Sequence, residues 1–128
     1  MEGKMDRILV VEDEKETADA IARFLKRKGF DIDVAYDLAD ALTKNISDYQ
    51  IVLLDILLKG EKSFPMLKKI KQEQPKLPVI IVSAYDNDEN ITEAKKLGAD
   101  GFIAKPVMTE YLENFLLSKI HSLRRKAE

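Results

Sequence analysis

The chain contains no cysteine and no apolar run long enough to cross a membrane. The absence of cysteine excludes disulfide bonds and cysteine-ligated metal sites, and it is compatible with a reducing compartment. The first residues, 1–7, carry no apolar signal segment. We therefore expect a cytoplasmic protein that does not bind membranes.

The chain also has little net charge and a single histidine. Its 21 basic and 23 acidic residues leave a net charge of -2, which gives no broad electrostatic reason to bind nucleic acid. His121 lies on an ordinary predicted helix, and we assign it no catalytic role. With 45% hydrophobic and 34% charged residues, 128 residues can bury one core. We expect a single domain over 1–128, with its core at about 6–123 and a tail or the start of a linker at 124–128.

Short apolar runs alternate five times with amphipathic segments along the chain. The predicted strands are 7–11, 31–36, 50–55, 79–83 and 101–104. The predicted helices are 14–28, 37–46, 63–74, 87–97 and 109–124, and Ser63 is expected to cap the third. Most of the strand runs are continuously apolar, which is typical of parallel strands covered by helices on both faces. The pattern predicts an α/β fold with a doubly wound, five-stranded parallel sheet.

Charged residues follow three of the predicted strands. Glu12 and Asp13 follow the first strand, Asp55 ends the third, and Lys105-Pro106 follows the fifth. The carboxyl ends of parallel strands meet in one crevice, where open α/β sheets bind ligands. Crowded carboxylates repel one another unless a cation intervenes, and magnesium prefers oxygen ligands. The sequence therefore predicts a Mg²⁺ site at this edge of the sheet.

These motifs, in this order, resemble the receiver domain of two-component response regulators. The matching segments are Val-Val-Glu-Asp-Glu at 10–14, Leu-Leu-Asp at 53–55, Ser-Ala at 83–84 and Gly-Ala-Asp-Gly-Phe-Ile-Ala-Lys-Pro at 98–106. Each motif alone is weak, but together at these spacings they are specific, and the resemblance covers almost the whole chain. It implies a flavodoxin-like (βα)5 three-layer sandwich with strand order 2-1-3-4-5.

The resemblance also implies a phosphoryl-transfer site. Asp55 would accept a phosphoryl group from the phosphohistidine of a sensor histidine kinase or a phosphotransfer protein. Mg²⁺ would be held by Glu12, Asp13, Asp55 and the backbone carbonyl of Leu57. The ammonium of Lys105 would offset the charge of the phosphoryl oxygens.

Three further residues match the family's switch. The hydroxyl of Ser83 would donate to a phosphoryl oxygen, and Phe102 would turn inward as that hydroxyl moves. Pro106 matches a proline that the family usually holds in a cis bond, which would direct Lys105 towards the site. The change would reach the surface of 87–97, 101–104 and 109–124, where a downstream effector or output domain would bind. A phosphorylation-dependent homodimer stays open, whereas direct nucleic-acid binding is not expected.

The segment after Asp55 departs from the family pattern. Lys59 stands where the family commonly has proline, and Gly60 alone remains of its usual glycines. The resemblance therefore leaves the loop shape open, and Lys59 can bring an extra cation near the phosphate. Leu57 offers no group to orient water and Tyr85 is bulky, so we predict slow hydrolysis of the aspartyl phosphate.

Other classes of protein remain to be weighed. A haloacid-dehalogenase-like, magnesium-dependent phosphatase places a second aspartate two residues after its nucleophile, and Leu57 stands there instead. A pseudo-receiver keeps the fold as a binding module without phosphorylation, but Asp13, Asp55, Ser83 and Lys105 are all retained. Each of these residues, taken alone, also has an ordinary structural explanation, such as acids at a helix amino terminus or a hydroxyl that bonds to the backbone. Jointly they predict a phosphorylation-activated signalling switch rather than a metabolic enzyme.

Overall fold

The computed structural model describes residues 6–85, 87–107 and 109–127. The strands are β1 (Arg7–Val11), β2 (Asp31–Ala35), β3 (Ile51–Leu54), β4 (Leu57–Leu58), β5 (Glu61–Lys62), β6 (Val79–Ser83) and β7 (Gly101–Ala104). The helices are α1 (Lys15–Arg27), α2 (Leu38–Leu42), the 3₁₀ helix η1 (Ile46–Asp48), α3 (Phe64–Glu73), α4 (Asp88–Lys96) and α5 (Thr109–Ala127). Within these described ranges no helix has both the length and the apolar character to span a bilayer.

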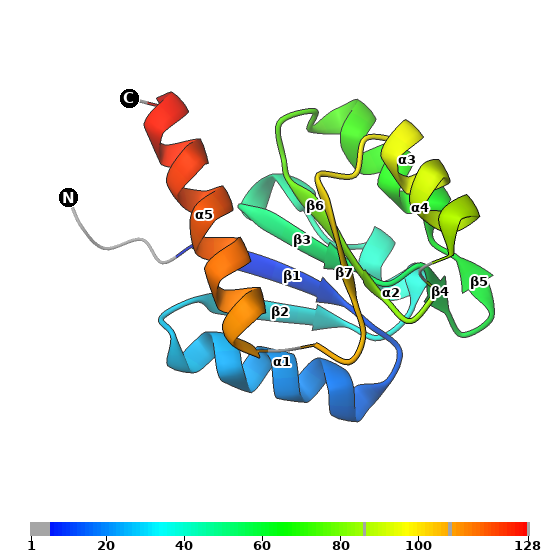
Figure 1. Cartoon of the computed structure of the whole chain (residues 1–128), viewed down its shortest axis with the longest axis horizontal. Helices are drawn as coiled ribbons and strands as arrows, with labels where there is room; N and C mark the ends of the chain where they lie inside the picture. Colours follow the sequence, from blue (N-terminus) through cyan, green and yellow to red (C-terminus); the bar gives the residue numbers. More distant parts are fainter. Residues whose placement is uncertain (1–5, 86, 108, 128) are drawn as a thin grey trace.

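Five strands form one parallel sheet in the order β2-β1-β3-β6-β7. Numbered along the chain as sheet strands only, this is the predicted order 2-1-3-4-5, so the doubly wound fold is confirmed. The strand arrows run towards the same end of the sheet in Figure 1. All five carboxyl ends therefore lie at one edge, where the charged residues after the strands can meet.

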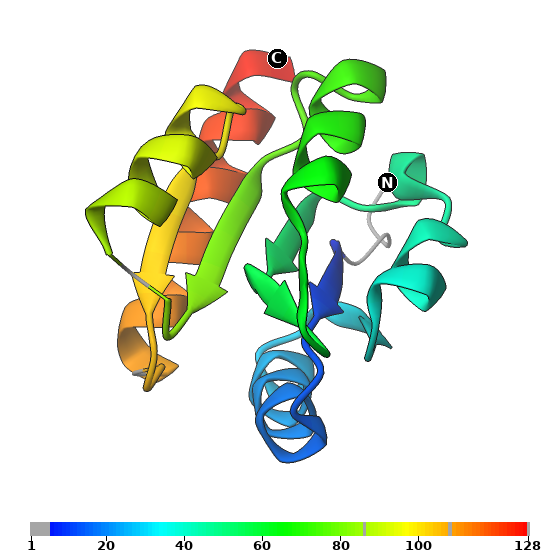
Figure 2. The same ribbon diagram turned by 90° about the vertical axis from the view of Figure 1, so that its right-hand side faces the viewer.

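One face of the sheet is covered by α1 and α5 (Figures 1 and 2). Four apolar residues of α1 are buried at helical spacing, namely Ala18, Ile21, Ala22 and Leu25. From α5, Leu112 and Leu116 are fully buried in the same cluster, which also holds Ile8 and Leu53 of the sheet. This apolar stripe fixes α1 so that the residues before it lie over the carboxyl ends of the strands.

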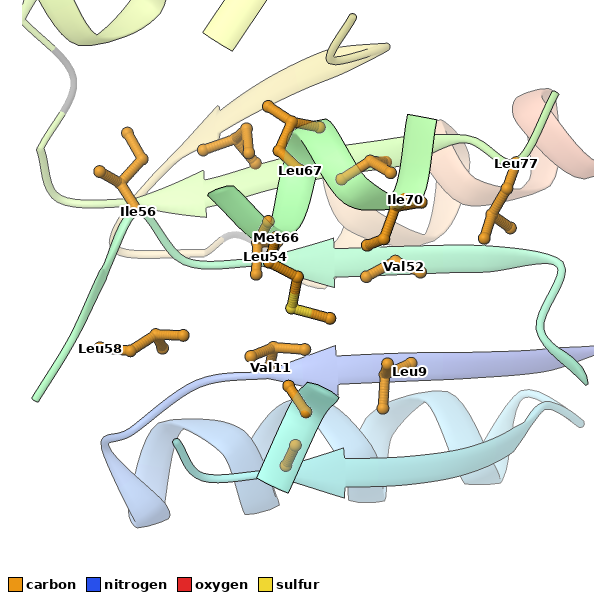
Figure 3. Close-up of a cluster of buried hydrophobic side chains, with 14 of the residues drawn as sticks. Leu9, Val11, Val52, Leu54, Ile56, Leu58, Met66, Leu67, Ile70 and Leu77 are labelled. Atoms are coloured by element: carbon orange, nitrogen blue, oxygen red, sulfur yellow. The ribbon is translucent and has the colours of Figure 1, made fainter. Parts of the chain in front are cut away.

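The opposite face is covered by α2, α3 and α4, and Figure 3 shows part of its core. Met66, Leu67 and Ile70 of α3 lie beside Val52 and Leu54 of β3. Each of these five side chains is at most 2% exposed. Helices on both faces explain why the strand runs are continuously apolar and confirm the predicted three-layer sandwich.

Two helices end more than one residue away from the predicted position. The second helix ends at Leu42 rather than near residue 46, and the chain then enters η1. A new turn begins because the side chain of Asn45 accepts hydrogen bonds from the backbone N–H and the hydroxyl of Ser47. At the carboxyl end, α5 continues to Ala127, past the predicted end near residue 124.

A short hairpin after β3 was not predicted. Strands β4 and β5 pair antiparallel around a two-residue turn, and Lys59 and Gly60 have φ angles of 49° and 84°. Two successive positive φ angles are characteristic of the type I′ turn that suits a tight hairpin. In Figure 1 the hairpin lies beyond the tip of β3, at the carboxyl end of the sheet. It is the element that gives the altered segment after Asp55 its shape.

Candidate functional site

The predicted acidic residues come together at the carboxyl edge of the sheet. Strands β1 and β3 are paired so that Val11 lies opposite Leu54, and the N–H of Asp55 donates to the carbonyl of Val11 at 3.1 Å. Carboxylate oxygens of Glu12, Asp13 and Asp55 all lie within 4.8 Å of one another. Glu12 is 3% exposed and Asp55 5%, whereas Asp13 is partly buried. The cluster is therefore a largely desolvated group of negative charges.

Lys105 brings one positive charge into this cluster from the end of β7. Its Nζ lies 2.9 Å from Oδ2 of Asp55 and also forms an ion pair with Glu12. Glu14 at the rim is more distant, at 3.5 Å. Only 13% of the Lys105 side chain is exposed, so the contact is shielded from water. One ammonium facing several carboxylates leaves the site with excess negative charge.

The crowding changes the acidity of two groups. Burial raises the pKa of Glu12 to about 7, and the nearby charge of Asp55 adds to this, while the hydrogen bond from Lys105 opposes it. Burial alone would lower the pKa of Lys105, but its hydrogen bonds to Glu12 and Asp55 raise it above the usual range. The ammonium therefore stays charged at neutral pH. An all-oxygen donor set with surplus negative charge fits a hard divalent cation such as Mg²⁺.

The predicted switch residues lie on the neighbouring strands. Ser83, at the end of β6, is fully buried, and its Oγ accepts a hydrogen bond from the N–H of Tyr85 at 3.2 Å. Its carbonyl accepts from the N–H of Lys105 at 3.1 Å, and the Lys105–Pro106 peptide bond is cis. Phe102 on β7 is partly buried against the core beneath α3 and α4. The structure thus brings Ser83, Lys105 and Pro106 to the same edge of the sheet as Asp55, whereas Phe102 lies within β7, opposite Ile81 of β6.

Ser63 has a role that the sequence did not reveal. We expected Ser63 to cap the third helix, and it stands at that position, but its side chain accepts no hydrogen bond from the helix. Instead the buried hydroxyl donates to the backbone carbonyl of Asp55 at 2.5 Å, and its N–H donates to the carbonyl of Ile56 at 2.7 Å. Ser63 closes the loop over the hairpin and holds the backbone of Asp55 in place. A serine eight residues from its partner gives no periodic signal that could have revealed this contact.

The side chain of Lys59 lies at the surface. Its Nζ is 3.8 Å from Oδ2 of Asp37 and its side chain is 61% exposed, so the ammonium faces Asp37 in this structure, and the extra cation near the phosphate stays a prediction. Its backbone N–H reaches the site instead and donates to Oδ2 of Asp13 at 2.8 Å. Leu57, the predicted carbonyl ligand, lies in β4, and its N–H is 3.4 Å from Oδ1 of Asp55. The hairpin therefore contacts both carboxylates through its backbone.

A cleft of about 600 Å³ opens beside Lys105, between α1 and the loop that follows β7. Ala20 and Ile21 of α1 and Val107 of the loop form its apolar walls, while Glu14 lies at the acidic end of the site. The cleft therefore borders the site at Lys105 and Glu14.

Comparison with known proteins agrees with this geometry. The family model described as the response regulator receiver domain matches residues 8–116. A cyclic di-GMP phosphodiesterase of Thermotoga maritima is 35% identical over 121 residues, which is 93% of this chain and 31% of that protein. The response regulator ArlR of Staphylococcus saprophyticus is 32% identical over 123 residues, 95% of this chain and 54% of that protein. A solved structure, a CheY-like receiver domain protein from Methanospirillum hungatei, has a TM-score of 0.90 at 26% identity and covers 96% of this chain and 99% of its own.

The chain spans about a third to a half of the length of the curated relatives it matches. The matched range nevertheless includes the acidic cluster, Ser83 and Lys105. On the family match, the strand order and the structural similarity together, the chain belongs to the family of response regulator receiver domains.

Proposed function

We propose that this protein is a phosphorylation-activated switch of a two-component phosphorelay, acting in the cytoplasm, with Asp55 as phosphoacceptor. Receiver domains are signalling switches that bind Mg²⁺ at an acidic pocket and interact with histidine kinases and output domains. The observation that carries the proposal is the buried Asp55 carboxylate, 2.9 Å from the Lys105 ammonium and clustered with Glu12 and Asp13. A nucleophile, a fixed cation and a set of oxygen ligands are what phosphoryl transfer requires.

In the proposed reaction Asp55 is the nucleophile. One carboxylate oxygen attacks the phosphorus of a phosphohistidine, the phosphorus–nitrogen bond breaks, and its electron pair returns to the imidazole. Lys105 offsets the charge on the phosphoryl oxygens because its ammonium is already held beside the carboxylate. Ser63 contributes by fixing the Asp55 backbone. The donor would be a sensor histidine kinase or a phosphotransfer protein, and the cleft beside Lys105 offers it a binding surface.

The residues present fit a bound Mg²⁺. Glu12, Asp13 and Asp55 would hold the ion, together with the backbone carbonyl of Leu57. When bound, the ion would neutralise charge on the phosphoryl oxygens during transfer. The Lys59 N–H keeps the Asp13 carboxylate turned towards the cluster, while Lys105 partly compensates the charge of Glu12 and Asp55.

The proposed output is a change of shape rather than chemistry on a second substrate. The hydroxyl of Ser83 would donate to a phosphoryl oxygen, and movement of Ser83 and Phe102 would change the surface formed by α4, β7 and α5. A downstream effector, an output domain or a second copy of the chain would bind there. The chemistry would be confined to Asp55 and to slow hydrolysis of its phosphate, so the protein would not be a metabolic enzyme.

Intact-mass spectrometry tests this proposal. Wild-type protein incubated with acetyl phosphate and Mg²⁺ should gain one phosphoryl group, and addition of a chelator should prevent this. Asp55→Asn should gain none, whereas Asp88→Asn, which changes an exposed carboxylate on α4, should behave like wild type. If folded, magnesium-bound wild type gains no phosphoryl group, the pseudo-receiver alternative replaces the proposal.

A further inference from the structure

A chain of hydrogen bonds runs from the switch serine to the first turn of α4. The N–H of Tyr85 donates to Oγ of Ser83 at 3.2 Å, and Nδ2 of Asn90 donates to the carbonyl of Tyr85 at 3.2 Å. Both ends of this chain are buried, with Ser83 at 0% and Asn90 at 7% exposure. The single residue Tyr85 is therefore held at its N–H by the strand and at its carbonyl by the helix.

Asn90 is an unusual residue for the place it occupies. The buried positions of α4 are Asn90 and Ala94, one turn apart, where an amphipathic helix normally presents apolar side chains to the core. The helix does not need Asn90 as a cap, because Asn87 fills that role and its Oδ1 accepts from the Asn90 N–H at 2.8 Å. Asparagine is also a weak helix former. The amide is thus explained by its bond to Tyr85 and not by helix formation.

We propose that Asn90 is a positioning residue that latches the segment after β6 in its resting conformation and thereby sets how readily Ser83 responds to phosphorylation. The inference rests on the proposed function. The resting Ser83 hydroxyl is tied to the Tyr85 N–H, and a shift of Ser83 towards a phosphoryl group on Asp55 must move or break that contact. Because Asn90 holds the other side of the Tyr85 residue, the same shift must also strain the contact with α4.

Loss of the Asn90 side chain should make the change to the active conformation easier. Among the described residues, Asn90 forms hydrogen bonds with Asn87 and Tyr85 and not with Asp55 or Lys105, so its loss should leave the nucleophile and the cation in place. Loss of Asn90 should instead lower the free energy needed to move Ser83 and Tyr85. A residue that biases a two-state equilibrium in this way changes the affinity for any ligand that selects the active state.

The test uses beryllofluoride, a phosphoryl mimic, titrated in the presence of Mg²⁺ and followed by the backbone amide signals of residues 83–85. Asn90→Leu and Asn90→Ala both remove the donor but pack differently, so agreement between them identifies the hydrogen bond as the cause. We expect both variants to bind beryllofluoride about fivefold more tightly than wild type. Without the ligand, the Tyr85 amide should exchange its proton faster. Glu89→Gln, on an exposed neighbour in α4, should match wild type.

The outcomes separate the latch from the proposed function. A wild type that responds to beryllofluoride, with Asn90 variants that bind it equally or more weakly, would overturn the latch alone. Unchanged Tyr85 exchange in folded variants would do the same. A wild type that neither binds beryllofluoride nor takes up a phosphoryl group would overturn the proposed function, and the latch with it. If Asn90→Leu fails to fold, Asn90→Ala decides between these results.

Discussion

Magnesium binding should weaken steeply as the pH falls below 7, because Glu12 has to lose a proton for the site to carry its full negative charge. Burial raises the pKa of Glu12 to about 7, with the charge of Asp55 adding to the shift and the hydrogen bond from Lys105 opposing it. A carboxyl group with its usual pKa would be ionised throughout this range. The pH dependence of Mg²⁺ binding therefore reports the desolvation of this one side chain.

The size of the effect follows from that pKa. With a value near 7, the ionised fraction of Glu12 falls from about nine-tenths at pH 8 to about one-tenth at pH 6. If Mg²⁺ binds the ionised form, the apparent Kd should rise about tenfold over this range, and binding at pH 6 should release about one proton. Calorimetric titration with magnesium chloride in two buffers of different ionisation enthalpy measures both quantities. Glu12→Gln should remove the pH dependence, and Glu89→Gln should keep it.

The same raised pKa has a defined effect on stability in the absence of metal. The folded protein holds the Glu12 proton more tightly than the unfolded chain, so this contribution is present below about pH 4.5 and is lost as the pH rises through about 7. In urea titrations at pH 8 with a chelator, Glu12→Gln should therefore have a higher free energy of unfolding than wild type, by up to about 3 kcal/mol.

A wild type whose Mg²⁺ affinity is the same at pH 6 and pH 8 would refute the assignment of a raised pKa to the buried Glu12.

The remaining predictions concern the hairpin, a distant ion pair and the lifetime of the phosphate. Lys59 adopts a φ of 49°, which disfavours most side chains, so Lys59→Asn should raise the free energy of unfolding by about 0.5–1 kcal/mol in urea titrations; a loss of stability would contradict the turn geometry. Lys71 is 14% exposed and donates to Oδ2 of Asp100 and to the carbonyl of Leu77 at 2.7 Å, so Lys71→Met should lower the free energy of unfolding by about 1–3 kcal/mol. The matched change Lys69→Met, in an exposed helical pair, should cost less than about 0.5 kcal/mol, and equal losses for the two would count against the partly buried contacts of Lys71. Leu57→Asn should shorten the lifetime of the phosphorylated form in a time course of intact mass, because an amide can orient water; an unchanged lifetime would show that Leu57 does not govern hydrolysis.

The sheet could be predicted because its signals are local. Residues of β1, β6 and β7 form continuous apolar runs, and their predicted bounds agree with the structure. The meeting of Glu12, Asp13 and Asp55 also followed from the sequence, since parallel pairing places the ends of neighbouring strands together. The order of the strands in the sheet thus brings three positions that are separate in the sequence into one cluster.

The parts that could not be predicted depend on contacts that leave no periodic pattern. Strands β4 and β5 have two residues each, too few to show an alternation, and the positive φ of Lys59 is not a preference of lysine. The hydroxyl of Ser63 was assigned to a helix cap, whereas loop closure turns it towards the backbone of Asp55. Asn90 gave no signal because an asparagine in a helical pattern is ordinarily taken as exposed.

Localisation of the phosphoryl group tests the central claim most directly. Borohydride reduces an acyl phosphate to an alcohol, so a phosphorylated aspartate becomes homoserine, which peptide mass spectrometry can place in the sequence. After treatment with acetyl phosphate and Mg²⁺, we expect homoserine at residue 55 and at no other aspartate. Homoserine at residue 13, or a phosphoryl group that survives reduction on Ser83, would contradict the assignment of Asp55 as the phosphoacceptor.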